Sequence, residues 1–257
     1  MEKIALITGA AGGIGSEFVR TLREHGDFDA LWVVSRNEEK LKALADITPV
    51  PLRVIAADLT DPASFDRIGA LFREEAPEIR LLVNASGYGK FEAVEDVLME
   101  TELNMIDLNC RALSAMTRLS LPYMHEGAGI IEIASVAAFQ PIPYINVYGA
   151  TKAFVLSYAR ALNMELKKRG IHVMALCPFW TRTGFFDRAV DPEKQPPVVK
   201  KYVAMYEPVF IVKTAWKAFE KKKDHVVPGF KAKMQVFLVK LLPHSLVMKV
   251  WMKQQKL

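Results

Sequence analysis

Seven short runs rich in Val, Ile and Leu recur along the first 230 residues, and the stretches between them are long enough for crossover helices. Most of these runs are apolar at successive positions rather than at alternate ones, so both faces of each strand are expected to be buried. They lie at Ile4–Thr8, Ala30–Ser35, Leu52–Ala57, Leu81–Asn84, Ile130–Ser135, Ile171–Cys177 and His225–Val227. The sequence therefore predicts an α/β fold: a doubly wound, seven-stranded parallel sheet with helices on both faces.

Nothing in the sequence marks a boundary between domains. No Ser/Gly-rich linker, low-complexity tract or internal repeat interrupts the chain, and 257 residues with 51% hydrophobic content suit one large core. We expect a single domain over residues 1–257, ending in a basic amphipathic tail at residues 230–257.

The cysteines and the N-terminus bear on the cellular compartment. Cys110 and Cys177 lie in apolar segments without metal-ligand spacing, so we expect buried free thiols and no metal site. Residues 1–8 pass directly into the first apolar run, without a signal-like stretch. These features predict a cytoplasmic protein.

A glycine-rich turn follows the first predicted strand and opens a helix-like segment. Gly9, Gly13, Ile14 and Gly15 belong to this turn. Glycines without a Cβ let backbone N–H groups and the helix N-terminus approach a pyrophosphate. A tight turn without a ligand is the alternative, but the position after the first strand favours a dinucleotide site.

Arg36 follows the second strand, where a site that prefers NAD usually has an Asp or Glu for the ribose hydroxyls. A guanidinium at this position pairs with a 2′-phosphate, and residues 31–37 contain no carboxylate to oppose that pairing. The alternative is a solvated arginine at a strand end. The sequence favours NADP(H) over NAD(H) as the cofactor.

Tyr148 and Lys152 share one face of a predicted helix because they are four residues apart. We expect the ammonium to stabilise the phenolate and to lower the tyrosine pKa from its usual value near ~10, which would suit proton exchange. Ser135, at the end of the fifth predicted strand, is in position to hold a substrate oxygen.

Taken together, T-G-x-x-x-G-x-G at residues 8–15, Ser135 and Y-x-x-x-K at residues 148–152 resemble the short-chain dehydrogenase/reductase family. The order, separation and serine offset all match, over roughly residues 1–190. The resemblance implies a Rossmann-type fold, with Tyr148 as catalytic acid/base and Ser135 polarising a carbonyl. It also implies that Lys152 hydrogen-bonds the nicotinamide ribose, and that the cofactor supplies the hydride.

The same resemblance assigns roles to four further residues. Asn109 matches an asparagine that holds a water in a proton relay to the lysine, although it could instead bond a neighbouring turn. Asp58 matches an aspartate at the adenine amino group, with a turn or helix cap as the alternative. Asn84 matches the first asparagine of a motif after the fourth strand, and Thr183 a threonine at the carboxamide.

Two departures from the family pattern stand beside the cofactor site. Ala85-Ser86 replaces the usual Asn-Ala, which puts the local contacts of that motif in doubt. Phe179 follows Pro178 where glycine is usual, so the loop beside the nicotinamide is expected to run differently.

Aromatic and aliphatic residues flank the proposed catalytic residues and predict an apolar, steroid- or lipid-like carbonyl substrate, although some of them could simply belong to the core. They are Phe139, Pro141, Ile142, Tyr144, Phe179, Trp180, Phe185 and Phe186.

The tail carries most of the positive charge. Residues 196–257 contain 13 Lys and three acidic residues, a local charge of +10, which leaves −5 in residues 1–195 because the whole chain carries +5. Two amphipathic helical patterns separated by Pro243 predict one of three roles: a lid, a subunit contact or a peripheral contact with the inner face of a membrane. Lysines interrupt both patterns, so neither spans a bilayer. We expect no nucleic-acid partner, since only the charge favours one.

The predicted activity is NADP(H)-dependent interconversion of a carbonyl and an alcohol, in a homodimer or homotetramer as is common in the family. A rival hypothesis is a non-catalytic NADPH-binding regulatory or membrane-associated protein on the same fold. Residues Asn109, Ser135, Tyr148 and Lys152 favour the enzyme. An enoyl reductase is disfavoured, because that branch separates its tyrosine and lysine by six residues.

Overall fold

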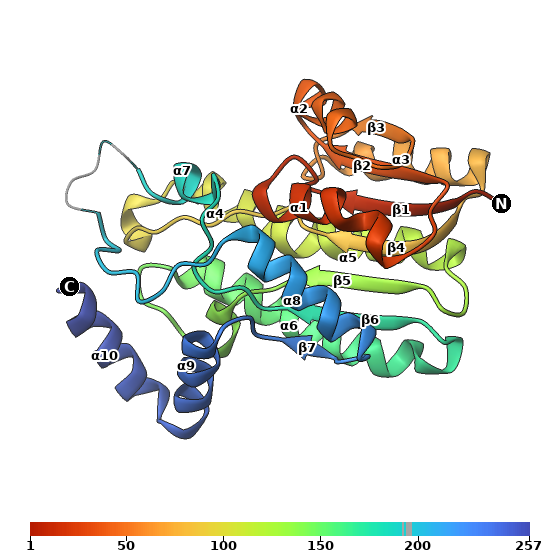
Figure 1. The fold of residues 1–257 in the computed structure, drawn as a ribbon. Helices are drawn as coiled ribbons and strands as arrows, with labels where there is room; N and C mark the ends of the chain where they lie inside the picture. Colours follow the sequence, from red (N-terminus) through yellow and green to blue (C-terminus); the bar gives the residue numbers. More distant parts are fainter. Residues whose placement is uncertain (192, 194–196) are drawn as a thin grey trace.

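The structure is a computed structural model that describes residues 1–191, 193 and 197–257. Within these residues, seven strands form one parallel sheet in the order β3-β2-β1-β4-β5-β6-β7 (Figure 1). The strands are β1 Lys3–Thr8, β2 Ala30–Ser35, β3 Leu52–Ala56, β4 Glu78–Asn84, β5 Gly129–Ile133, β6 His172–Leu176 and β7 His225–Val226. This confirms the predicted doubly wound sheet.

Successive residues of each central strand point into two different apolar layers, which is why the strands are apolar throughout. In β1, Ile4 and Leu6 join the layer formed with helices α3, α5 and α6, while Ala5 and Ile7 join the layer formed with α1, α2 and α8. The helices are α1 Gly13–Thr21, α2 Glu38–Lys42, α3 Pro62–Glu75, α4 Met99–Ile106, α5 Leu113–Ser120, α6 Asn146–Glu165, α7 Phe185–Ala189, α8 Pro208–Glu220, α9 Phe230–Leu241 and α10 His244–Gln255.

The strand order reverses direction between β1 and β4, and such a reversal opens a crevice at the carboxyl ends of the strands. The chain after β1 turns outward into α1 on one face of the sheet, and the chain after β4 leads to α4 on the other. Both connections therefore leave the sheet at the same edge, where the candidate site lies.

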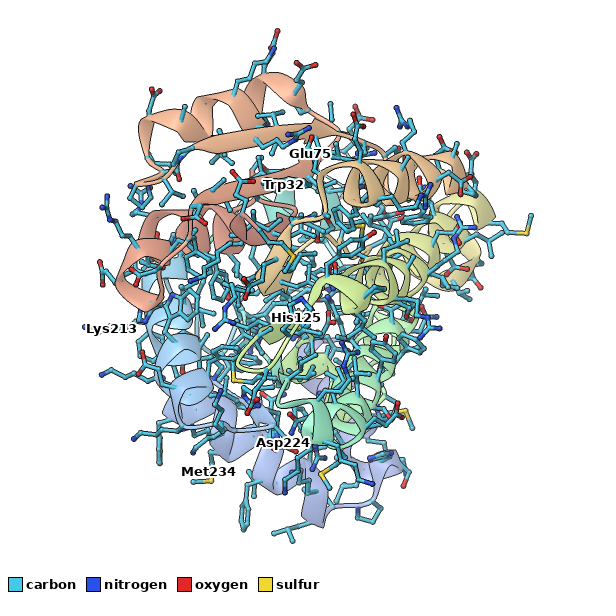
Figure 2. All side chains as sticks on the ribbon, turned by 90° about the vertical axis from the view of Figure 1, so that its right-hand side faces the viewer. Trp32, Glu75, His125, Lys213, Asp224 and Met234 are labelled. Atoms are coloured by element: carbon cyan, nitrogen blue, oxygen red, sulfur yellow. The ribbon has the colours of Figure 1, made fainter. Side chains whose placement is uncertain are left out.

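The tail forms two helices, as predicted, with Pro243 between them. Ala232 and Val236 of α9 pack into the core layer of α6, and Trp251 of α10 packs into a third apolar cluster. In Figure 1 the two helices lie at the end of the molecule opposite the N-terminus. Figure 2 shows Met234 of α9 at the opposite end of the molecule from Trp32 and Glu75. No helix among the described residues has the length and apolar character needed to cross a bilayer.

Two local expectations differ from the structure. β5 ends at Ile133, so Ser135 lies two residues beyond it and begins a short 3-10 turn, because its hydroxyl accepts the N–H of Ala137 at 3.1 Å. Cys177 is buried, whereas Cys110 is half-buried. Burial raises the pKa of Cys110 to about 11 and that of Cys177 to about 12, so neither thiol is reactive near neutral pH.

Candidate active site

A cavity of about 860 Å³ lies at the carboxyl edge of the sheet. Its floor is the glycine turn and the segments that follow β4 and β5, and its walls are the segment after β6 and the helices α9 and α10. Tyr148, Ser135 and Lys152 all line it, as do Gly13, Ile14 and Gly15 of the glycine turn. The cavity therefore brings the glycine turn and the predicted catalytic residues Ser135, Tyr148 and Lys152 together, whereas Arg36, Asp58, Asn84 and Asn109 do not line it.

The glycine turn is shaped by close backbone contacts. Gly9 has φ of 64°, and a Cβ there would lie 2.6 Å from the Ser86 nitrogen. A Cβ on Gly15 would collide with the Gly9 carbonyl, and one on Gly13 would lie 2.5 Å from the Thr183 side chain. Larger residues at these positions would therefore force the turn and the loop above it apart.

The N-terminus of α1 opens onto this cavity and fits the pyrophosphate of a dinucleotide. Among the described residues no side chain caps α1, and its first turn contains no acidic residue. The N–H groups at a helix N-terminus carry partial positive charge and attract an anion. Thr183 stands directly over Gly13 with its methyl group nearest, while its hydroxyl accepts the Phe185 N–H at 3.2 Å.

The turns around Arg36 and Asp58, expected at the adenosine of a cofactor, hold more charge than the sequence indicated. Arg36 at the end of β2 lies 4.0 Å from Asp58, and Asp58 also accepts hydrogen bonds from the N–H and hydroxyl of Thr60 at 2.9 and 2.8 Å. Burial opposes ionisation of Asp58, but the Thr60 bonds and the charges of Arg36 and Arg188 lower its pKa below the usual value. Asp58 is thus an ionised carboxylate in a turn, beside the arginine proposed for the 2′-phosphate.

Asn84 is turned away from the cavity and into the sheet. Its amide nitrogen donates to the Thr117 hydroxyl at 3.0 Å and to Glu132 at 3.3 Å, and its oxygen accepts from Thr8 at 3.4 Å. The Thr8 hydroxyl in turn accepts the Ser86 N–H at 3.3 Å. Asn84 therefore joins β1, β5 and α5, and it orients the loop that lines the cavity through Thr8.

Glu132 is a fully buried carboxyl in β5 that sequence reasoning missed. One of its oxygens accepts from Thr117 and Asn84, while the other has no hydrogen-bond partner among the described residues. Burial raises its pKa to about 7, although both hydrogen bonds and the charge of Lys152 act in the opposite direction. A Glu within an apolar run is a signal that sequence reading could have used.

Tyr148 stands near the start of α6 and faces the cavity between two aromatic rings. Its ring centroid lies 6.3 Å from that of Phe91 and 5.5 Å from that of Phe185. Burial raises the pKa of Tyr148 to about 12, and a hydrogen bond with the Ser135 side chain only partly offsets this. The expected lowering of the Tyr148 pKa is thus wrong for this structure, because burial of the phenol dominates.

Lys152 lies one helical turn beyond Tyr148 and is almost fully buried. Its ammonium donates to the Ile133 carbonyl at 2.6 Å and lies 5.7 Å from the centre of the Tyr148 ring. Burial lowers the pKa of Lys152 to about 8, while Cys110, Cys177 and Glu132 act to raise it. A Cβ on Gly87 would come within 3.5 Å of the lysine nitrogen, so the missing side chain keeps that approach open.

Asn109 is fully buried in a π-helical turn, Asp107–Ala112, between α4 and α5. Its side chain accepts the Tyr88 N–H at 3.0 Å, and donates to the Tyr88 carbonyl at 2.9 Å and to the Thr151 hydroxyl at 3.0 Å. The side chain thus fixes the loop after β4 next to Lys152, which corresponds to the alternative of bonding a neighbouring turn.

Five of the eight apolar residues expected at the substrate line the cavity, and three do not. Phe139 packs instead beside His225 and Lys240. The five are Ile142, Phe179, Trp180, Phe185 and Phe186, and the others outside the lining are Pro141 and Tyr144.

Sequence reasoning missed cavity residues that come from distant segments. The cavity is also lined by Phe91, Lys40 and Arg188 and, from the tail, by Phe230, Met234, Leu238, Leu242, Val247, Val250 and Trp251. The apolar stripes of the tail were recognised, but a stripe does not say what it faces. The tail is a wall of the cavity, which is one of the alternatives left open.

Comparison with known proteins gives consistent matches. A profile of the family described as short chain dehydrogenase matches residues 3–194. A very-long-chain 3-oxoacyl-CoA reductase of Anas platyrhynchos is 37% identical over 210 residues, which cover 77% of this chain and 66% of that protein.

Two solved structures are similar along most of their length. A short-chain dehydrogenase from Sphingobium yanoikuyae in complex with NADPH matches with a TM-score of 0.77 and 30% identity, covering 91% of this chain and 92% of that one. A 3-ketoacyl-(acyl-carrier-protein) reductase from Brucella melitensis complexed with NADH matches with a TM-score of 0.70 and 25% identity, covering 84% of this chain and 90% of that one.

Proposed function

The chain belongs to the short-chain dehydrogenase/reductase family and is an oxidoreductase, and we propose that it interconverts a carbonyl and an alcohol with Tyr148 as general acid and base. The observation that carries this proposal is that Tyr148, Ser135 and Lys152 line one largely apolar cavity together with the glycine turn. We further propose that residues 1–257 act as a single domain.

The proposed roles of the residues follow from their contacts. A nicotinamide cofactor supplies or accepts the hydride when it is bound. In reduction, Tyr148 donates its proton to the carbonyl oxygen, and its raised pKa keeps the phenol protonated at neutral pH. Ser135 orients that oxygen, and Lys152 binds the ribose side of the cofactor and supports return of the proton. Thr183, beside the glycine turn, is proposed for the carboxamide.

The proposed cofactor is NADP(H) rather than NAD(H). Arg36 at the end of β2 supports this, as does the NADPH bound to the similar Sphingobium protein, whereas the similar Brucella protein binds NADH. The carboxylate of Asp58, 4.0 Å from Arg36, reduces the positive electrostatic potential at this position. The variant Arg36→Asp should reverse the ratio of kcat/KM for NADPH and NADH. An unchanged ratio would exclude Arg36 as the residue that reads the phosphate.

The proposed substrate is a bulky apolar ketone or aldehyde, of steroid or lipid type. The cavity volume, its aromatic lining around Tyr148 and the acyl substrate in the name of the duck relative support this. The test is NADPH oxidation over a panel of ketones and aldehydes of increasing chain length. Turnover that rises with apolar size is expected. Cofactor binding without turnover of any compound would favour a regulatory protein.

We also propose a homodimer or homotetramer, formed through adjoining apolar faces of α4 and α6. Leu103, Ile106 and Phe154 are each more than two-fifths exposed on these two helices, which pack against each other.

The proposed location is cytoplasmic, with peripheral membrane contact through the tail. Helix α9 supports this contact, because it carries exposed Phe237 and Leu241 next to Lys240.

A further inference from the structure

Arg188 lines the cavity from the segment that follows β6. It belongs to α7, five residues after Thr183, and its guanidinium carbon lies 3.3 Å from the centre of the Tyr88 ring. Tyr88 is held in place by Asn109 at its backbone and by Thr101 and Asn104 at its hydroxyl, with distances of 2.8 and 3.0 Å for the last two. The arginine therefore rests on a rigid aromatic surface, and it lines the cavity.

The charges around Arg188 are unbalanced. Partial burial lowers the pKa of Arg188, and the like charge of Arg36 lowers it further, while Tyr88 and the opposite charge of Asp58 act to raise it. Arg188 forms no ion pair with any residue that the structure describes, while Asp58 already faces Arg36 and Thr60. Two guanidinium groups, those of Arg36 and Arg188, thus act on the carboxylate of Asp58. Arg188 lines the cavity together with Lys40 and Asp187, whereas Arg36 lies outside the lining.

Excess positive charge that converges in a cavity favours an anion with more than one negative charge. The N-terminus of α1, at Gly12–Gly13, already provides for the pyrophosphate. The remaining candidate anion at the Arg36 end is a phosphate on the adenosine ribose.

We propose that Arg188 is a second residue that binds the 2′-phosphate of NADP(H), opposite Arg36, and that it does so from the substrate-binding segment. This proposal rests on the proposed cofactor. Because α7 also supplies Phe185 beside Tyr148, the bound phosphate would hold the substrate wall against the cofactor. Binding of the cofactor phosphate by Arg188 would then also position Phe185 of the same helix beside the substrate.

The test uses adenosine 2′,5′-bisphosphate and 5′-AMP, which differ by the 2′-phosphate and lack the nicotinamide. Isothermal titration of the intact protein should show that Arg188→Gln raises the Kd of the bisphosphate by about tenfold or more and changes that of AMP by less than about twofold, because charge-assisted hydrogen bonds to a phosphate are lost. Arg188→Lys should keep part of the affinity. The matched control is Arg182→Gln, since Arg182 is exposed, pairs with Glu207 at 2.8 Å and does not line the cavity.

The outcomes separate this proposal from the proposed cofactor. If the unmodified protein binds the bisphosphate no tighter than AMP, the preference for NADP(H) is wrong. If the unmodified protein distinguishes the two and Arg188→Gln does so equally well, the role of Arg188 is excluded. Equal weakening of both ligands would place Arg188 at the 5′-phosphate and overturn the assignment to the 2′-phosphate.

Discussion

At the scale of single residues, the proposed chemistry depends on one hydroxyl group. Tyr148→Phe removes the phenolic oxygen and keeps the ring between Phe91 and Phe185. We expect kcat/KM for carbonyl reduction to fall by at least ~10²-fold, as loss of a general acid requires, while the Kd for NADPH stays nearly unchanged. Steady-state kinetics and cofactor titration measure the two effects. Substantial turnover by the variant would remove Tyr148 from the mechanism.

Glu132 makes stability depend on pH in a direction opposite to that of a paired carboxylate. Its pKa is about 7 in the folded protein and 4.5 as the unperturbed value, so between these values the folded state binds a proton that the unfolded state lacks. Stability is therefore highest below the unfolded pKa and is lost as the pH rises through about 7, by on the order of 3 kcal/mol.

The variant Glu132→Gln tests this at the same residue. An amide keeps the oxygen that accepts from Thr117 and Asn84 but does not titrate. The difference in free energy of unfolding between pH 5.5 and pH 8, measured by denaturant titration, should shrink in this variant and persist in Glu74→Gln, an exposed position on α3. An identical pH profile in Glu132→Gln and the unmodified protein would show that Glu132 is ionised throughout.

Residues whose partners are close in sequence were predictable, and those with distant partners were not. Tyr148 and Lys152 share a helix face by their spacing, and the glycine turn is local. The bonds of Asn84 to Thr117 and Glu132 span 33 and 48 positions, so no pattern in one segment reveals them. Arg188 was missed for the same reason, because its contact with Tyr88 depends on how the segment after β6 folds back.

At the scale of elements, the last turn of α10 holds the segment before α8 in place. The fully buried Gln255 side chain accepts the N–H groups of Lys200 and Lys201 at 2.8 and 2.9 Å and donates to the Lys201 carbonyl at 3.1 Å. Sequence periodicity predicted the helix and its start after Pro243. It could not predict this polar anchor, because a glutamine near a chain end is usually solvated.

Gln255→Ala should therefore destabilise the protein, although it only shortens one side chain in the last turn of α10. Backbone groups of Lys200 and Lys201 would lose their partner, at about 1–3 kcal/mol for each group that stays buried. We expect a lower Tm by several degrees and faster cleavage of the 197–206 segment by protease. Gln254→Ala, the same change at a half-buried neighbouring position that faces the cavity, is the control. Equal Tm values for the two variants would contradict the anchoring role.

At the scale of the whole molecule, charge and exposed apolar surface gather at the same end. Residues 196–257 carry +10 against −5 for the rest. In α9, Phe230, Phe237 and Leu241 have exposed fractions of 76%, 58% and 65%, with Lys231, Lys233 and Lys240 in the same helix. Sequence alone left this tail open as lid, subunit contact or membrane contact, because an amphipathic pattern does not identify what covers its apolar side. The structure makes its inner face a cavity wall, and the outer face is still exposed.

An anionic membrane would complement this outer face, with lysines at the headgroups and the exposed rings in the interfacial region. Deleting the tail is a poor test, since Ala232 and Val236 belong to the core. Single substitutions at exposed positions leave these core residues in place and therefore test membrane binding alone. Phe237→Glu and Leu241→Glu should each reduce co-sedimentation with phosphatidylserine vesicles, and Met164→Glu, equally exposed but on α6, should not.

Varying the salt concentration gives a second, independent test of membrane binding. Binding of the unmodified protein should weaken as salt rises, because exposed lysines are screened over about 8 Å at physiological ionic strength. If the unmodified protein stays in the supernatant at low salt, membrane contact is excluded, and the exposed face of α9 is left to a subunit contact. Binding that Met164→Glu reduces as much as the two α9 variants would show that contact is not specific to the tail. Since α9 also lines the cavity, binding confined to the tail would bring an apolar substrate in the membrane close to the site where Tyr148 acts.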